Sequence, residues 1–63
     1  MNNPSEHPRP GLTIKLFYTC LITGLASSYY GIWTGDQWAI KEPDRFEMYQ
    51  PVPKDLVVTG WEY

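Results

Sequence analysis

The chain has 63 residues and a net charge of −2 at pH 7, with one cysteine and one histidine. A soluble chain this short buries little surface and usually needs disulfides or a metal site, and a single thiol with a single imidazole supplies neither. The mild negative charge and the lack of a basic cluster in the sequence also argue against nucleic-acid binding.

Residues 1–11 form a polar arm that contains Pro4, Pro8 and Pro10. Prolines at this spacing favour an extended, polyproline-like backbone and are incompatible with a helix interior. The arm is therefore expected to end at Gly11, and a helix is expected to begin just after it, with Thr13 supporting the first turn.

Residues 12–35 are predicted to form a transmembrane helix. No side chain from Leu16 to Gly35 is charged. About 20 helical residues, at a rise of about 1.5 Å each, span about 30 Å, which matches the hydrocarbon core of a bilayer. The sequence thus predicts an all-α membrane protein, with a single transmembrane helix and extended, irregular N- and C-terminal tails.

On a helical wheel the side chains of this segment separate by size. One face is large and apolar, which suits lipid tails, and it carries Ile14, Phe17, Leu21, Ile22, Leu25, Tyr29 and Ile32. The opposite face is a ridge of small residues that would let another helix approach closely. The residues predicted for this helix packing are Thr19, Thr23, Gly24, Ser27 and Gly31, with Cys20 beside them and Gly35 as the C-cap.

Two other interpretations of the apolar segment remain open. Its threonines, serines and tyrosines lower the mean hydropathy to about +1, so a buried helix of a soluble protein is one alternative, although nothing else in the chain could bury it. A signal peptide is the other, because Leu16 to Leu25 has the length of an apolar signal region and Ala26-Ser27-Ser28 resembles a cleavage site. The long, proline-containing region before it is atypical of a signal peptide.

Aromatic residues make up 16% of the chain and flank the apolar segment or follow it. Those near its end are predicted to form a belt at the membrane–water interface: Tyr29, Tyr30, Trp33 and Trp38. Residues 36–63 are predicted to be a tail without a core of its own, lying on a partner protein. Its further interface anchors are Phe46, Tyr49, Trp61 and Tyr63. Within this tail, the β-prone run from Leu56 to Thr59 is suited to extend a partner's sheet.

The sequence predicts no enzyme. His7 and Cys20 are far apart along the chain, and neither has the neighbours that acid–base or nucleophilic catalysis requires. The carboxylates of residues 36–47 alternate with cations, so no metal site is predicted. The apolar segment holds no histidine that would ligate a pigment or haem. We therefore expect no catalytic residue, no metal and no cofactor of its own, and leave peripheral contact with lipid, quinone or pigment open.

Two pieces of the chain resemble the MWFE-type accessory subunit of mitochondrial respiratory complex I. The first comprises Pro10-Gly11-Leu12-Thr13-Ile14, Cys20-Leu21-Ile22 and Gly24-Leu25-Ala26-Ser27-Ser28-Tyr29. The second is Trp38-Ala39-Ile40-Lys41-Glu42-Pro43-Asp44-Arg45, similar to the stretch after that family's membrane helix. Together they cover about half of the chain. The resemblance implies a subunit without a redox centre that supports assembly of a membrane arm.

The predicted function is therefore that of a non-catalytic, single-span accessory subunit, which stabilises or assembles a respiratory or photosynthetic membrane complex. The expected partners are larger integral membrane subunits and membrane lipid, with no nucleic acid. The expected location is the mitochondrial inner membrane or a bacterial inner or photosynthetic membrane. The orientation stays open, because Arg9 and Lys15 near one end are matched in number by Lys41 and Arg45 near the other. The closer placement of Arg9 and Lys15 favours the N-terminus on the negative side. The alternative is a regulatory membrane micropeptide that binds a transporter or pump.

Overall fold

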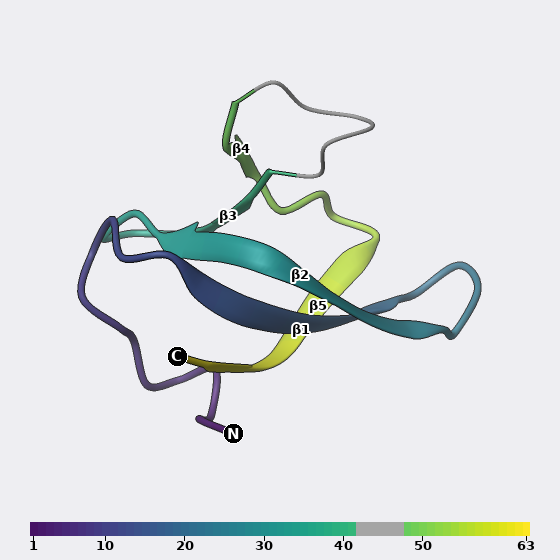
Figure 1. Ribbon diagram of the computed structural model, residues 1–63. Coiled ribbons are helices and arrows are strands. Elements are labelled where there is room, and N and C mark those ends of the chain that lie inside the picture. Colours follow the sequence, from purple (N-terminus) through teal and green to yellow (C-terminus); the bar gives the residue numbers. More distant parts are fainter. Residues whose placement is uncertain (42–47) are drawn as a thin grey trace.

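The computed structural model describes residues 1–41 and 48–63, which form an antiparallel sheet (Figure 1). The sheet has five strands in the order β4-β3-β2-β1-β5. The first four strands follow one another as a meander, and β5 returns to pair with β1 on its other side. The strands are β1 Ile14–Cys20, β2 Ala26–Trp33, β3 Trp38–Ile40, β4 Gln50–Pro51 and β5 Leu56–Glu62.

Strand β1 lies between β2 and β5 in the sheet, and its side chains alternate between two environments. Ile14, Leu16 and Tyr18 are buried, whereas Lys15 is exposed and Phe17 is only half-buried. This period of two is the signature of a strand with one buried face. Complete burial of an aliphatic side chain such as Leu16 stabilises the fold by about 1.5–3 kcal/mol. The core of the described residues therefore forms around β1.

The transmembrane helix predicted over 12–35 is wrong, because this segment forms the β1–β2 hairpin. No helix among residues 1–41 and 48–63 has both the length and the apolarity needed to cross a membrane. The predicted all-α class, the single-pass description and the location in an energy-converting membrane are corrected accordingly. The β-branched and aromatic residues that lowered the hydropathy of the segment also favour strands.

A tight turn separates the two strands of this hairpin. The Gly24 N–H donates to the Cys20 carbonyl at 2.8 Å, and the Cys20 N–H donates to the Leu25 carbonyl at 2.9 Å. Gly24 has a φ of 73°, a left-handed conformation that side chains other than glycine rarely adopt. The residue interpreted as part of a helix-packing ridge therefore serves to reverse the chain.

The packing of the sheet requires a small residue at the position of Gly31. It is buried on β2, opposite Ile14 of β1 and Ile40 of β3. A Cβ placed on Gly31 would lie 2.5 Å from Leu16 Cδ1 and 2.6 Å from the Ala39 carbonyl oxygen. The close approach that was attributed to a second helix is thus an approach between strands of one sheet.

Residues 36–63 also differ from the prediction of a tail without a core. Ala39 and Ile40 of β3 and Trp61 of β5 are buried and complete the core around β1. The run from Leu56 to Thr59 does extend a sheet, but the sheet is the chain's own, since it pairs with β1. The register of that pairing shifts between Phe17 and Tyr18, as at a β-bulge. Apolar surface in the first half of the chain is therefore covered by the second half.

Candidate binding pocket

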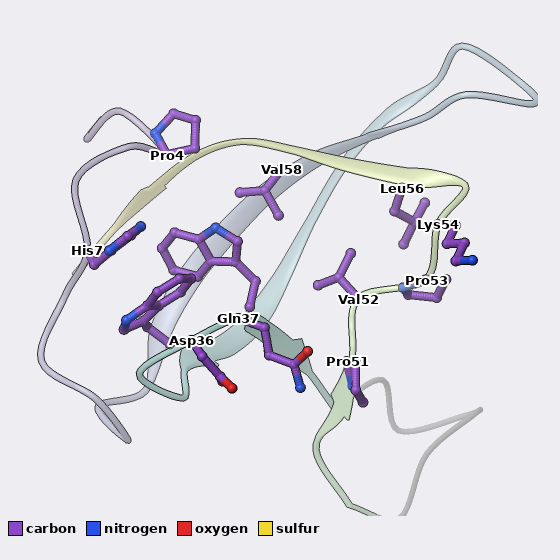
Figure 2. A pocket seen from close by; sticks show the side chains of 12 residues that line it. Pro4, His7, Asp36, Gln37, Pro51, Val52, Pro53, Lys54, Leu56 and Val58 are labelled. Atoms are coloured by element: carbon purple, nitrogen blue, oxygen red, sulfur yellow. The ribbon is translucent and has the colours of Figure 1, made fainter.

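A pocket of about 510 Å³ lies between β5, β3 and the segment that joins β4 to β5 (Figure 2). Figure 2 shows the side chains of Val52, Leu56 and Val58 directed towards its interior, with His7 and Lys54 at opposite ends. Its size falls within the range of small-ligand and peptide sites. Apolar side chains form its middle, and the ionisable groups lie near its ends.

Two tryptophans line the pocket near the His7 end. Trp33 ends β2 and Trp38 begins β3, so the register of the β2–β3 pair places them opposite each other. Their ring centroids are 4.9 Å apart and their planes meet at 65°. Trp38 also lies 6.5 Å from the ring of Trp61, whose other neighbour is Tyr63 at 5.2 Å. The pocket therefore opens onto a continuous row of aromatic rings.

The N-terminal arm is fastened to the sheet at both of its ends. Asn2 forms an antiparallel bridge with Trp61, with hydrogen bonds of 2.7 and 3.1 Å. At the other end the Gly11 N–H donates to the Trp33 carbonyl at 2.9 Å. A turn at Pro10 and Gly11, in which Leu12 N–H donates to the Arg9 carbonyl and Gly11 has a φ of 83°, leads the chain into β1. The arm must therefore cross the aromatic row between these two points.

The middle of the arm contacts that row closely. The His7 ring stacks on Trp33 with centroids 3.7 Å apart and planes 14° from parallel. The Trp61 indole Nε1–H donates to the Glu6 carbonyl at 2.8 Å. Pro8 is buried, and Pro4 lines the pocket. A proline-rich segment of this chain thus occupies an aromatic surface through ring stacking and an indole-to-carbonyl hydrogen bond.

The β2–β3 turn brings one carboxylate to the same end of the pocket. The Thr34 hydroxyl donates to Asp36 Oδ1 at 2.6 Å and so holds the carboxylate in the turn. Gly35, with a φ of 115°, allows this tight connection. Within residues 1–41 and 48–63, Asp36 forms no ion pair. It therefore remains available for an external cation.

Prolines stiffen the opposite wall. Pro51 and Pro53 flank Val52, whose N–H donates to the Trp38 carbonyl at 3.1 Å. The Leu56 N–H then donates to the Pro53 carbonyl at 3.1 Å and starts β5. Because proline fixes φ, this wall loses little conformational freedom when a ligand binds.

No three potential metal ligands cluster among residues 1–41 and 48–63. Cys20 lies at the end of β1 and does not line the pocket. Hydrogen bonds from the backbone and hydroxyl of Thr23, and from the backbone of Ile22, lower the pKa of the Cys20 thiol. The sequence alone gave His7 no neighbours, whereas in the structure its ring contacts the rings of Trp33 and Trp38.

The predicted helix-packing residues are not brought together on one face. Thr19 is half-buried on β1, Gly31 is buried on β2, and Ser27 is exposed on β2. Thr23 and Gly24 lie in the exposed turn between these strands. Whether any of them contacts a partner stays a prediction, but the helix that would align them is absent from the described residues.

The predicted aromatic anchors that lie within the described residues divide into three groups. Trp33, Trp38 and Trp61 belong to the aromatic row, and Trp61 is part of the core. Tyr29 packs against the core, whereas Tyr30, Tyr49 and Tyr63 are exposed. Phe46 lies outside the described residues. The tryptophans singled out as interface anchors are thus the residues that line or border the pocket.

Sequence reasoning missed His7, Asp36 and the Pro51–Pro53 wall as parts of one site. The usable signal was the coincidence of three tryptophans with two proline-rich segments, a composition typical of peptide recognition. Their convergence could not be inferred, because it depends on the return of β5 to β1.

Comparisons with known proteins identify no relative of this chain: no family model, no curated protein and no solved structure matches it.

Proposed function

We propose that this protein is a non-catalytic binding module, which holds an extended, proline-containing segment of a partner protein against its aromatic row. The observation that carries the proposal is the position of the chain's own arm. The His7 ring of this proline-rich arm stacks on Trp33, and its Glu6 carbonyl accepts the indole N–H of Trp61. An indole donor to a backbone carbonyl is a contact that such recognition uses. A partner segment of similar composition would use the same surface.

The chemistry of the pocket supports a proline-containing ligand. Extended proline-rich backbones expose their carbonyls, and their rings pack flat on aromatic side chains. Trp33 and Trp38 offer such faces, and the apolar middle of the pocket around Val52 and Val58 would take a ring or an aliphatic side chain. Such a ligand is also ordered before binding, which reduces the entropic cost of association.

The proposal retains one part of the sequence-based hypothesis. A non-catalytic subunit that joins a larger partner remains the proposed role, now without the predicted transmembrane helix. The resemblance to the complex I subunit also stays a hypothesis, and the helix on which part of it depends is replaced by the β1–β2 hairpin.

The arm is expected to compete with a ligand. A tethered segment acts at an effective concentration on the order of millimolar, so an added peptide binds weakly while the arm is in place. The His7→Ala variant of the full chain removes the ring stacked on Trp33 and weakens this competition.

The test is a titration of the isotope-labelled His7→Ala variant with a synthetic peptide that copies residues 1–11. The indole N–H signals of Trp33 and Trp38, followed by nuclear magnetic resonance, should shift progressively. A peptide with alanine at each of its proline positions should produce much smaller shifts. Tyr30→Ala, which removes an exposed aromatic ring outside the pocket, should leave binding unchanged. Indole signals that do not move at peptide concentrations on the order of millimolar would overturn the proposal.

A further inference from the structure

We infer that the His7 end of the pocket is a subsite for a planar cation, so that the segment bound there presents an arginine to Trp33 and Asp36. This inference rests on the proposed function, because it specifies which side chain the bound segment carries. The His7 ring is the chain's own occupant of the subsite.

The shape of the subsite selects a flat group. His7 lies parallel to Trp33 at 3.7 Å, while Trp38 meets the His7 ring edge-on, at 5.8 Å and 78°. Trp33 thus forms a floor and Trp38 a side wall. A guanidinium group is planar and stacks on a tryptophan face at this kind of separation. A branched aliphatic side chain would not reproduce the stack.

The charge beside the subsite selects a cation. Asp36 lines the same pocket, is oriented by the Thr34 hydroxyl and forms no ion pair with any described residue. The cation that lines the pocket, Lys54, lies at the far end (Figure 2). A positive group stacked on Trp33 therefore gains both cation–π attraction and attraction to a carboxylate.

Arginine satisfies both conditions better than lysine. Its guanidinium combines a flat face for Trp33 with N–H donors at its edge, which are directed towards groups beside the ring such as the Asp36 carboxylate. A lysine ammonium carries the same charge without a flat face. Citrulline has the flat shape of arginine without the charge. Comparing these three side chains separates the contribution of the flat shape from that of the positive charge.

The experiment measures binding of three peptides to the full-length His7→Ala variant by isothermal titration calorimetry. Each peptide copies residues 1–11, with arginine, citrulline or lysine at the position of His7. We expect the arginine peptide to bind most tightly, and the citrulline and lysine peptides to bind about 3- to 10-fold more weakly.

Asp36→Asn, which preserves the acceptor for Thr34, should weaken binding of the arginine peptide severalfold and leave binding of the citrulline peptide unchanged. Glu62→Gln removes the same charge from a residue that does not line the pocket and should change neither.

The outcomes distinguish this inference from the proposed function. Equal affinities for the three peptides, with the indole signals of Trp33 and Trp38 still shifting, would overturn the cation subsite and leave the binding module intact. Lysine binding as tightly as arginine would overturn the preference for a planar cation. The absence of binding by all three peptides would overturn both proposals.

Discussion

The two ends of the β1–β2 hairpin both carry apolar side chains, but they differ in how far these side chains are buried. At the end near Ile14 and Trp33, the arm is hydrogen-bonded to the sheet, and Ile14 is 1% exposed. At the other end the turn projects away from the remaining strands (Figure 1), and Ile22 is 80% exposed. Apolar side chains occur at both ends, so hydropathy does not decide which are buried. Contacts between segments distant in sequence decide it.

The largest expected difference between the two ends comes from one substitution made in each. Leu16→Ala empties a site that is 0% exposed and should lower the free energy of unfolding by about 2–5 kcal/mol. Leu21→Ala, in the projecting turn at 64% exposure, should change it by less than about 0.5 kcal/mol. Urea denaturation followed by tryptophan fluorescence measures both. Similar losses would show that the turn is packed as tightly as the core.

A somewhat smaller loss is expected where the strands approach most closely. Gly31→Ala places a methyl group against Leu16 and the Ala39 carbonyl, and it should lower the free energy of unfolding by about 1–3 kcal/mol. Ser27→Ala, at an exposed position on the same strand, is the control and should be nearly neutral. An unchanged denaturation midpoint for Gly31→Ala would contradict the packing of β2 between β1 and β3.

One hydrogen bond that attaches the arm, from the Trp61 indole to the Glu6 carbonyl, is expected to contribute about 1 kcal/mol to the free energy of unfolding. Trp61→Phe retains an aromatic ring in the core and removes the indole N–H that donates to the Glu6 carbonyl. We expect a loss of about 0.5–1.5 kcal/mol from the hydrogen bond, in addition to the cost of the smaller buried ring, together with faster amide hydrogen exchange at Asn2. If exchange at Asn2 is unchanged, the arm is held by other contacts.

The smallest expected effect is on the reactivity of the Cys20 thiol beside the projecting turn, and not on the stability of the fold. Hydrogen bonds from Thr23 and Ile22 lower the pKa of the Cys20 thiol, so its thiolate forms at lower pH than in an ordinary cysteine. Thr23→Val removes the hydroxyl but retains the backbone, and it should move the pH profile of alkylation of Cys20 to higher pH. Thr19→Val, which removes a neighbouring hydroxyl that does not affect this pKa, should leave the profile in place.

Part of the fold was readable from the sequence. The apolar–charged–apolar order of Ile14, Lys15 and Leu16 fits the period of a strand, and Gly24 marks a turn between two β-prone runs. The spacing of the small residues by four favoured a helix instead. That spacing is a coincidence of two strands, since Thr19 and Ser27 lie on β1 and β2 and Thr23 lies in the turn between them.

Most of the candidate site could not be predicted from the sequence. The tryptophans were predicted to be interface anchors, and this stays a prediction. The pairing of Asn2 with Trp61 and the stacking of His7 on Trp33 join residues far apart in the chain. No local pattern encodes such contacts, because they form only after β5 has paired with β1.

The most direct test of the account locates a bound segment on one of the two ends of the hairpin. Intermolecular nuclear Overhauser effects can be recorded between the full-length His7→Ala variant and the peptide that copies residues 1–11, with arginine at the position of His7. The account predicts contacts from that arginine to the ring protons of Trp33 and Trp38. Contacts that map instead to Leu21, Ile22 and Leu25 in the projecting turn would contradict it.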